Sequence, residues 1–138
     1  MNTIESSGIL GLIAMVILTV NIVMGIMLST NYKQSTYWQR LSPKIKAFKI
    51  INIHNYTAYL ALFFVFLHFI IIPLDPSSKF NFKHLLLPLT APHQPVFVLL
   101  GLISFIAILI VVITTQKVIK NKLGTTTWRN IHVISYAT

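Results

Sequence analysis

Cysteine is absent from the 138-residue chain, and only Glu5 and Asp75 are acidic. Without cysteine there is no disulfide framework, no thiolate metal site and no CxxCH attachment motif. With both carboxylates outside the apolar runs, a four-ligand zinc or copper site is hard to assemble. The same lack of buried carboxylates disfavours a proton-coupled cation transporter. These classes are therefore set aside before any motif is considered.

Charge of either sign is also scarce, at 9% of residues, against 55% hydrophobic residues. Three long runs, 6–32, 50–74 and 84–116, carry no Asp, Glu, Lys or Arg, and each can supply the roughly 20 apolar residues of a membrane span. We expect an all-α, polytopic membrane helix bundle with three complete spans, about Gly8–Thr30, Ile50–Leu74 and Val96–Gln116. A truncated fourth span is expected from Trp128. Residues 1–138 then form a single transmembrane domain, incomplete at the C-terminus because only nine residues follow Arg129.

The net charge of +9 is unevenly spread along the chain. Nine of the eleven basic residues fall in the first and third connectors (Lys33, Arg40, Lys44, Lys46, Lys49, Lys117, Lys120, Lys122 and Arg129). The positive-inside rule makes these connectors cytoplasmic, with the N-terminus outside, in a multi-pass protein of the cell membrane. Spans two and four then run parallel. The basic runs are interpreted as an orientation signal beside anionic lipid, and nucleic-acid binding is disfavoured.

Two histidines stand in the second span, where an unpartnered imidazole is costly. Fourteen residues separate His54 from His68, so the two share a helix face, about 21 Å apart along the axis. The positions between them on that face are Ala58, Ala61 and Val65. The bulky side chains are expected to point elsewhere (Tyr56, Tyr59, Leu60, Phe63, Phe66 and Leu67). Small residues between two imidazoles leave room for a flat macrocycle with iron at its centre.

A haem needs a second ligand at the same depth on another helix. His54 is five residues past Lys49 and His132 three past Arg129, which places them about 7 and about 5 Å into the membrane. We expect His54 and His132 to ligate one haem b near the cytoplasmic face, with Arg129 or Lys49 available to its propionates. His68 would be one iron ligand of a second haem, whose partner would lie beyond the end of this chain.

Other polar groups are given structural roles. The first span carries Gly11, Ala14, Leu18, Asn21 and Gly25 on one face, which we expect to face the bundle, with Asn21 as a polar contact between helices. Tyr136 shares a face with His132 and could pack beside a haem or in the core. His84 and His93 lie in the outer connector and are expected to be solvated.

The histidine pair, followed by "LLLPLTAPHQPVFVLLG" and "KNKLGTTTWRNIHVISYA", resembles the ferric reductase-like transmembrane domain. That family includes ferric reductases, NADPH oxidases and the haem-binding membrane subunit of the bacterial methionine-sulfoxide reductase system. The resemblance runs from the first span to the C-terminus, and its specific part is the histidine pair with the WRxxH entry. It implies a bundle with b-type haem that carries electrons across the membrane, with His54 and His132 ligating the inner haem and His68 the outer one.

The chain departs from the family pattern in two places. The fourth histidine is missing, which leaves the outer haem half completed, and no flavin- or NAD(P)H-binding domain follows. The electron donor would then be a cytoplasmic flavin or NAD(P)H protein, with flavin carried on that partner, a quinol, or a lost C-terminal portion of the chain. An extracytoplasmic reductase or ferric iron would accept the electrons.

Two other functions remain open. One is a membrane transporter or channel in which the histidines relay protons, which would favour polar residues where Ala58, Ala61 and Val65 stand. The other is a cofactor-free membrane anchor subunit that recruits a soluble partner through its basic connectors. No side chain of the chain is expected to act as a catalytic acid or base, so any enzymatic activity would depend on haem.

Overall fold

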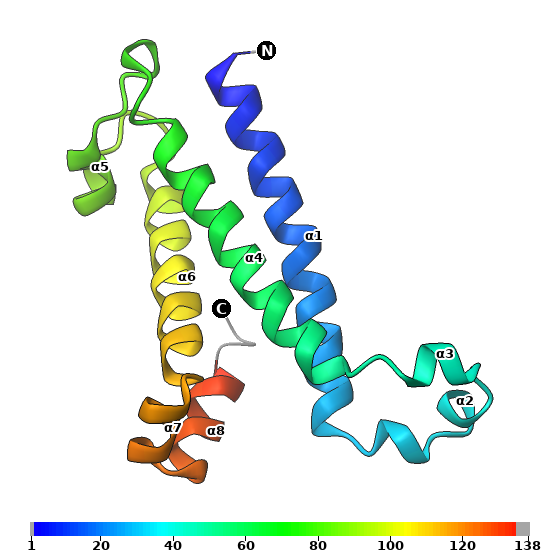
Figure 1. Cartoon of the computed structure of the whole chain (residues 1–138). Helices are drawn as coiled ribbons and strands as arrows, with labels where there is room; N and C mark the ends of the chain where they lie inside the picture. Colours follow the sequence, from blue (N-terminus) through cyan, green and yellow to red (C-terminus); the bar gives the residue numbers. More distant parts are fainter. Residues whose placement is uncertain (1, 135–138) are drawn as a thin grey trace.

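The computed structural model describes residues 2–134, and the chain is helical through most of that range (Figure 1). Three helices, α1 (Thr3–Ser29), α4 (Ile50–Ile71) and α6 (Pro95–Thr114), are long and apolar enough to cross a membrane. Short elements join them: η1 (Tyr32–Gln34), α2 (Thr36–Gln39), α3 (Pro43–Lys46), η2 (Pro76–Ser78), α5 (Phe82–Leu86), η3 (Pro88–Thr90), α7 (Lys117–Leu123) and α8 (Thr125–Ile134). The predicted all-α bundle is confirmed, and its apolar helices suggest a multi-pass protein in a lipid bilayer.

Several helix boundaries differ from those expected. Helix α1 begins at Thr3 rather than Gly8, because Asn2 and Glu5 form a capping box in which each side chain bonds the other's backbone N–H. Helix α4 ends before Leu74, since Pro73 has no N–H to continue the helical ladder. Residues expected to form a loop after the third span form α7, and the next helix begins at Thr125, ahead of Trp128.

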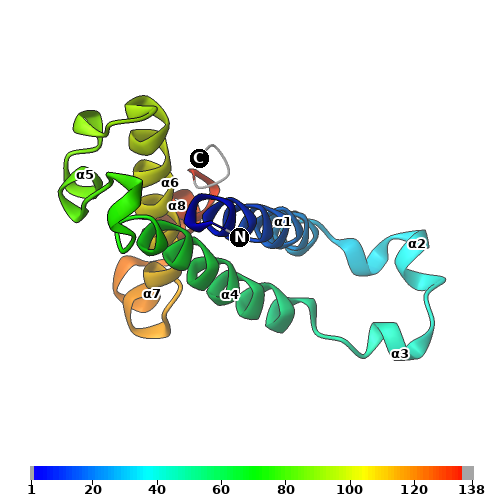
Figure 2. The ribbon, with the colours of Figure 1, turned by 90° about the horizontal axis from the view of Figure 1, so that it is seen from above.

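Helices α1 and α4 form the main packed unit, antiparallel and side by side in two views (Figures 1 and 2). Their shared face is built from small residues: Ala14 and Gly25 are buried on α1, and Ala61 on α4 is 0% exposed. Without bulky side chains at the contact, the two backbones approach closely and gain dispersion contacts that lipid cannot replace. The face predicted for the first span is therefore the one that meets the bundle.

Helix α6 completes the bundle on the other side of α4. The rings of Phe69 and Phe105 lie 5.3 Å apart, and the Gln116 amide donates a 2.5 Å hydrogen bond to the Tyr59 hydroxyl oxygen. Helices α7 and α8 then fold back at the lower end in Figure 1, joined by Gly124, whose φ of 83° favours glycine. This reversal returns α8 to the end of the bundle at which α4 begins.

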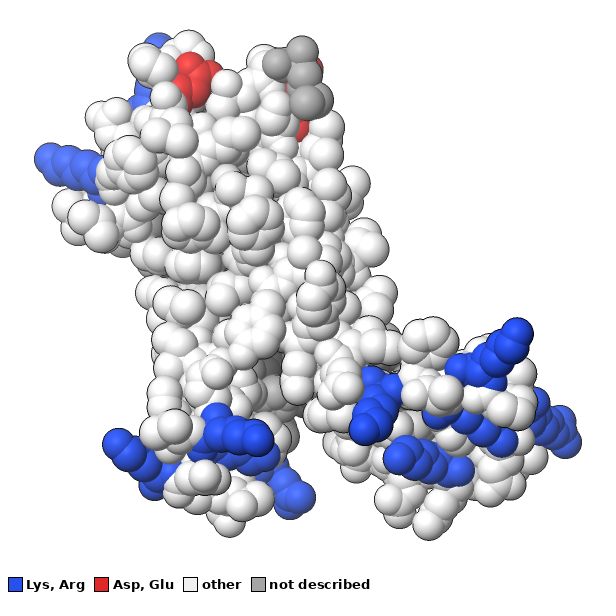
Figure 3. All heavy atoms as spheres, viewed as in Figure 1, with Lys and Arg blue, Asp and Glu red and all other residues white. Residues whose placement is uncertain are grey.

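Charge is segregated between the two ends of the molecule (Figure 3). The connectors with nine of the eleven basic residues lie at one end, and Glu5 and Asp75 lie at the other with Lys79 and Lys83. The surface between them is apolar, as expected for a face in contact with lipid.

The Asp75 carboxylate lies at the end of the bundle where α1 begins. Hydrogen bonds from the hydroxyls of Thr3 and then Ser77 lower the pKa of Asp75 by favouring its ionised form. Because this pKa is lowered, the ionised Asp75 carboxylate stabilises the folded protein. This stabilisation is complete above the ordinary pKa of the group and is lost as the pH falls through the lowered value.

We predict that Ala61→Leu lowers the free energy of unfolding by about 1–3 kcal/mol, because the added methyl groups have no space between α1 and α4. Val16→Leu also enlarges a helix side chain, but Val16 is 57% exposed, so it is the matched control and should change little. Unfolding in mixed detergent micelles measures both variants. Equal stability of the two would contradict the close α1–α4 contact.

Candidate functional site

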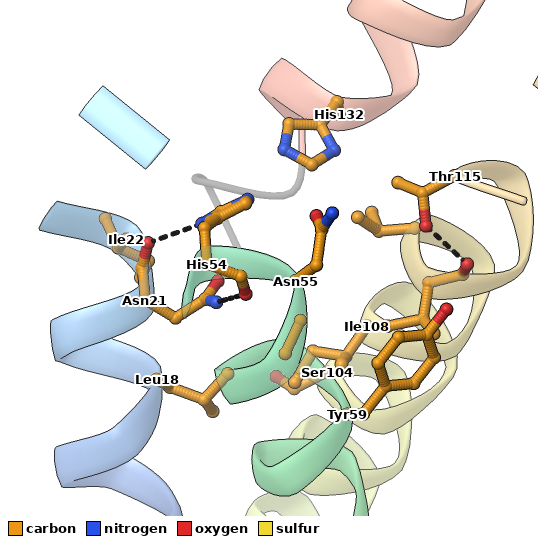
Figure 4. Close-up of a pocket in the computed structure, with 13 residues that line it drawn as sticks. Leu18, Asn21, Ile22, His54, Asn55, Tyr59, Ser104, Ile108, Thr115 and His132 are labelled. Carbon is orange, nitrogen blue, oxygen red and sulfur yellow. Dashed lines mark hydrogen bonds between the residues drawn. The ribbon is translucent and has the colours of Figure 1, made fainter. Parts of the chain in front are cut away.

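His54 and His132, predicted to lie at the same depth, meet at the end of the bundle where α4 begins. Their ring centroids are 6.0 Å apart with an interplanar angle of 62°. The rings border a cavity of about 310 Å³, within the usual size of small-ligand pockets (Figure 4). Helices α1, α4, α6 and α8 all contribute to its lining, with Leu18, Ala58, Ile108 and Val112 among the apolar residues. The site therefore depends on the whole bundle.

The His54 ring is held by α1. Its Nδ1 lies 3.1 Å from the backbone oxygen of Asn21, and a carbonyl can only accept, so Nδ1 carries the proton. In the neutral ring, Nε2 then keeps a lone pair and is the nitrogen able to bind a metal. In return, the Asn21 amide donates to the His54 carbonyl at 2.6 Å and to the Thr57 hydroxyl at 2.8 Å. The predicted role of Asn21 as an interhelical contact is confirmed.

His132 is held within α8 by an aromatic stack. The Trp128 ring lies 5.2 Å from the His132 ring at an angle of 28°, and Lys120 Nζ on α7 sits 3.9 Å from the centre of the Trp128 ring. Trp128 was expected as the start of the fourth span, and its contact with His132 was not. Its spacing of four residues from His132 is the signal that could have predicted the stack. Lys120, Trp128 and His132 are thus stacked in sequence, from the basic end of the molecule to the site.

His68 lies near the opposite end of α4, away from the other two histidines. Its Nδ1 is 2.7 Å from the Ser7 backbone oxygen and 3.0 Å from Ser7 Oγ. A groove of about 570 Å³ runs beside it, lined by Gly8, Gly11 and Val65 among others. This groove shares Leu18 and Ile22 with the first cavity, so the two hollows adjoin along α1. Of the predicted stripe, Ala58 borders the first cavity and Val65 the groove, whereas Ala61 between them is buried.

The other residues named from the sequence take varied places. Arg129 is exposed on α8, one turn before His132, and Lys49 is the exposed N-cap of α4. His84 accepts a hydrogen bond from the Asn81 backbone N–H and caps α5, while His93 is exposed. Tyr136 lies outside the described residues.

One of the bulky residues of α4 also borders the cavity. Tyr59 is among the lining residues, and its hydroxyl oxygen accepts a hydrogen bond from Gln116 beyond the end of α6. Sequence reasoning also missed Asn55, Ser104 and Thr115 in the lining. Single polar residues at these positions have no spacing that distinguishes them from ordinary helix contacts.

The separation of the His54 and His132 rings agrees with the spacing that two imidazoles would need to bind one iron. A metal–imidazole bond is about 2 Å long, which gives ring centres about 6 Å apart. Within residues 2–134 no group of three or more His, Cys, Asp or Glu comes together to hold a metal. A zinc site needs such a group, whereas a porphyrin brings four ligands of its own.

Compared with family models, with curated proteins and with solved structures, the chain matches none of them. The resemblance to the ferric reductase-like transmembrane domain therefore remains an expectation drawn from the residues quoted above. The geometry of the histidines stands independently of it.

We predict that Gly11→Ala is less stable than Gly8→Ala by about 1–3 kcal/mol. A Cβ at Gly11 would lie 3.1 Å from the His68 ring, whereas one at Gly8 would meet nothing within 4 Å. Both changes gain similar helix propensity, so their difference isolates the contact with His68. Unfolding in mixed micelles gives the stabilities, and the imidazole resonances of His68 should shift only in Gly11→Ala. Indistinguishable variants would contradict the placement of the ring over Gly11.

Proposed function

We propose that this protein is a haem b-containing transmembrane electron carrier of the ferric reductase-like kind, in which His54 and His132 would hold one haem iron. The observation that carries the proposal is the 6.0 Å separation of these two rings at a cavity shared by four helices. Iron held in a porphyrin by two imidazoles supplies reversible single-electron chemistry.

The residues of the chain have three tasks in this function. The backbone oxygen of Asn21 holds the His54 proton on Nδ1 and leaves Nε2 for the metal. The apolar part of the lining excludes water and lowers the local dielectric, which tunes the potential of a bound metal. Arg129 and Lys49, close in sequence to the two ligands, are the cations available to carboxylates at the edge of the cofactor.

Charge sets the orientation of the chain. By the positive-inside rule the end with nine basic residues would face the cytoplasm, so a cytoplasmic donor would deliver electrons there and an outer acceptor would receive them at the end that carries Asp75. The donor class is a reduced flavin on a separate cytoplasmic protein, supplied by NAD(P)H, or a quinol. The acceptor class is ferric iron or an extracytoplasmic reductase. His68, with its adjoining groove, is the candidate ligand of a second haem nearer the outer face.

A proton-relaying transporter is the second candidate, and one observation favours it. Asn55, Ser104 and Thr115 place polar groups in the same cavity as the histidines. Against it, Ala58 in that cavity and Val65 in the adjoining groove cannot carry protons along the path between His54 and His68. The two functions differ in one outcome: transport would survive depletion of haem, and electron transfer would not.

We predict that protein purified from cells with ample haem shows b-type absorption bands that sharpen on reduction. His54→Ala and His132→Ala should each lower haem content by about tenfold or more, since each removes a ligand. His84→Ala and His93→Ala are matched controls in the outer connector and should retain wild-type bands.

Absorption spectra of oxidised and reduced protein, normalised to protein concentration, measure all four variants. Absence of b-type bands from the wild type would reject the proposal. Equal loss in the His84→Ala control would reject the assignment of His54 and His132 as ligands.

A further inference from the structure

Each histidine of α4 is bonded to α1 in the same reciprocal way. His54 Nδ1 meets the Asn21 backbone oxygen at 3.1 Å, and the Asn21 side chain donates back to the His54 backbone oxygen at 2.6 Å. His68 Nδ1 meets the Ser7 backbone oxygen at 2.7 Å, and the Ser7 hydroxyl donates back to the His68 backbone oxygen at 3.4 Å. We call these two arrangements the inner clasp (Asn21–His54) and the outer clasp (Ser7–His68).

The spacing of the clasps follows the geometry of the helix pair. Fourteen residues separate Ser7 from Asn21, and fourteen separate His54 from His68. Fourteen residues span the same axial distance on both helices. When Asn21 lies beside His54 in the antiparallel pair, Ser7 therefore lies beside His68, and one axial alignment of α1 on α4 satisfies both clasps. The closely packed small residues between them hold that alignment.

The backbone oxygens favour one tautomer of each neutral ring. At His68 the Ser7 hydroxyl also lies 3.0 Å from Nδ1; with the ring proton on Nδ1, that hydroxyl oxygen accepts, and its own proton is left for the His68 backbone oxygen. A backbone oxygen has no proton to give, so a ring with its proton on Nε2 would set the Nδ1 lone pair against that oxygen at 2.7–3.1 Å. The bonds from the Asn21 and Ser7 side chains to the backbone oxygens of His54 and His68 have a separate effect. They hold α1 against α4, so that the α1 backbone oxygen stays opposite Nδ1 of each histidine. A hydrogen bond of this kind contributes about 0.5–1.5 kcal/mol, enough to bias a tautomer.

We infer that Asn21 and Ser7 are positioning residues that hold His54 and His68 as the Nδ1–H tautomer, with Nε2 presented for a metal, before any metal binds. The first span thus acts on both candidate ligands without supplying one itself. A further consequence rests on the proposed function: a ring that donates from Nδ1 to a carbonyl is a more basic ligand, which favours the oxidised state of a bound metal.

The first experiment uses the full-length chain without haem, with ¹⁵N-labelled histidine, in lipid at about two pH units above the ordinary imidazole pKa of about 6.5. Imidazole ¹⁵N shifts report which nitrogen carries the proton. In the wild type, His54 and His68 should each show the Nδ1–H tautomer alone. Asn21→Leu should give a mixed population at His54 and leave His68 unchanged, and Ser7→Ala should do the reverse.

Each variant is therefore the control for the other. Thr19→Val is a third control, because the Thr19 hydroxyl bonds only back to Met15 of its own helix, and both histidines should keep their wild-type tautomers. Ser7→Thr retains the hydroxyl and should restore the Nδ1–H tautomer of His68. An Nε2–H tautomer in the wild type, or no change at His54 in a folded Asn21→Leu, would overturn the inference. If Asn21→Leu does not fold, an unchanged His68 tautomer in Ser7→Ala overturns it.

The second experiment uses the haem-loaded protein and measures midpoint potential. Asn21→Leu should weaken binding of the oxidised relative to the reduced metal about tenfold, which for one electron is a rise of about 59 mV. An unchanged potential in Asn21→Leu would overturn the tuning role. If His54 and His68 show the Nδ1–H tautomer but the protein binds no haem, the proposed function is rejected and the positioning role stands. If the protein shows haem bands but the histidines show mixed tautomers, the positioning role is rejected and the proposed function stands.

Discussion

The close antiparallel contact between α1 and α4 is the constraint on which the remaining structure depends. An apolar helix gains little by leaving lipid for another apolar helix, so association needs close packing and polar bonds that lipid cannot provide. Both occur along one face: buried Ala14, Gly25 and Ala61 bring the backbones together, and the bonds of Asn21 and Ser7 fix the helices along their common axis. The rest of the bundle is built on this pair.

Small residues have two consequences in this arrangement. On the side toward α1 they allow contact, and on the side toward α6 and α8 they leave space, so that Ala58 borders the cavity while Ala61 is buried. The cavity is closed at the basic end by the reversal at Gly124, which brings α8 and its aromatic stack against the first turns of α4. A site of this kind combines rigid imidazoles with room beside them, as a ligand that is flat and large requires.

Much of the fold could be predicted from the sequence, because lipid imposes strong and local demands. Charge-free runs of sufficient length predicted the three long helices, and the distribution of basic residues predicted which connectors share an end. The ends of the helices were less predictable. The start of α1 is set by a capping box, and α7 arises where a polar loop was expected, both through local bonds that average hydropathy does not detect.

For the site, the sequence by itself determined that His54 and His68 share a face cleared of large side chains and that His132 lies at a comparable depth, since helical periodicity fixes both. Only the tertiary structure decided that the rings of His54 and His132 are 6.0 Å apart, that Tyr59 borders the cavity, and that Trp128 stacks on His132. It also decided that Ser7 and Asn21 hold the imidazoles. The physical reason is that periodicity describes one helix, whereas a hydrogen bond between helices depends on their axial alignment, which only the packed helix pair sets.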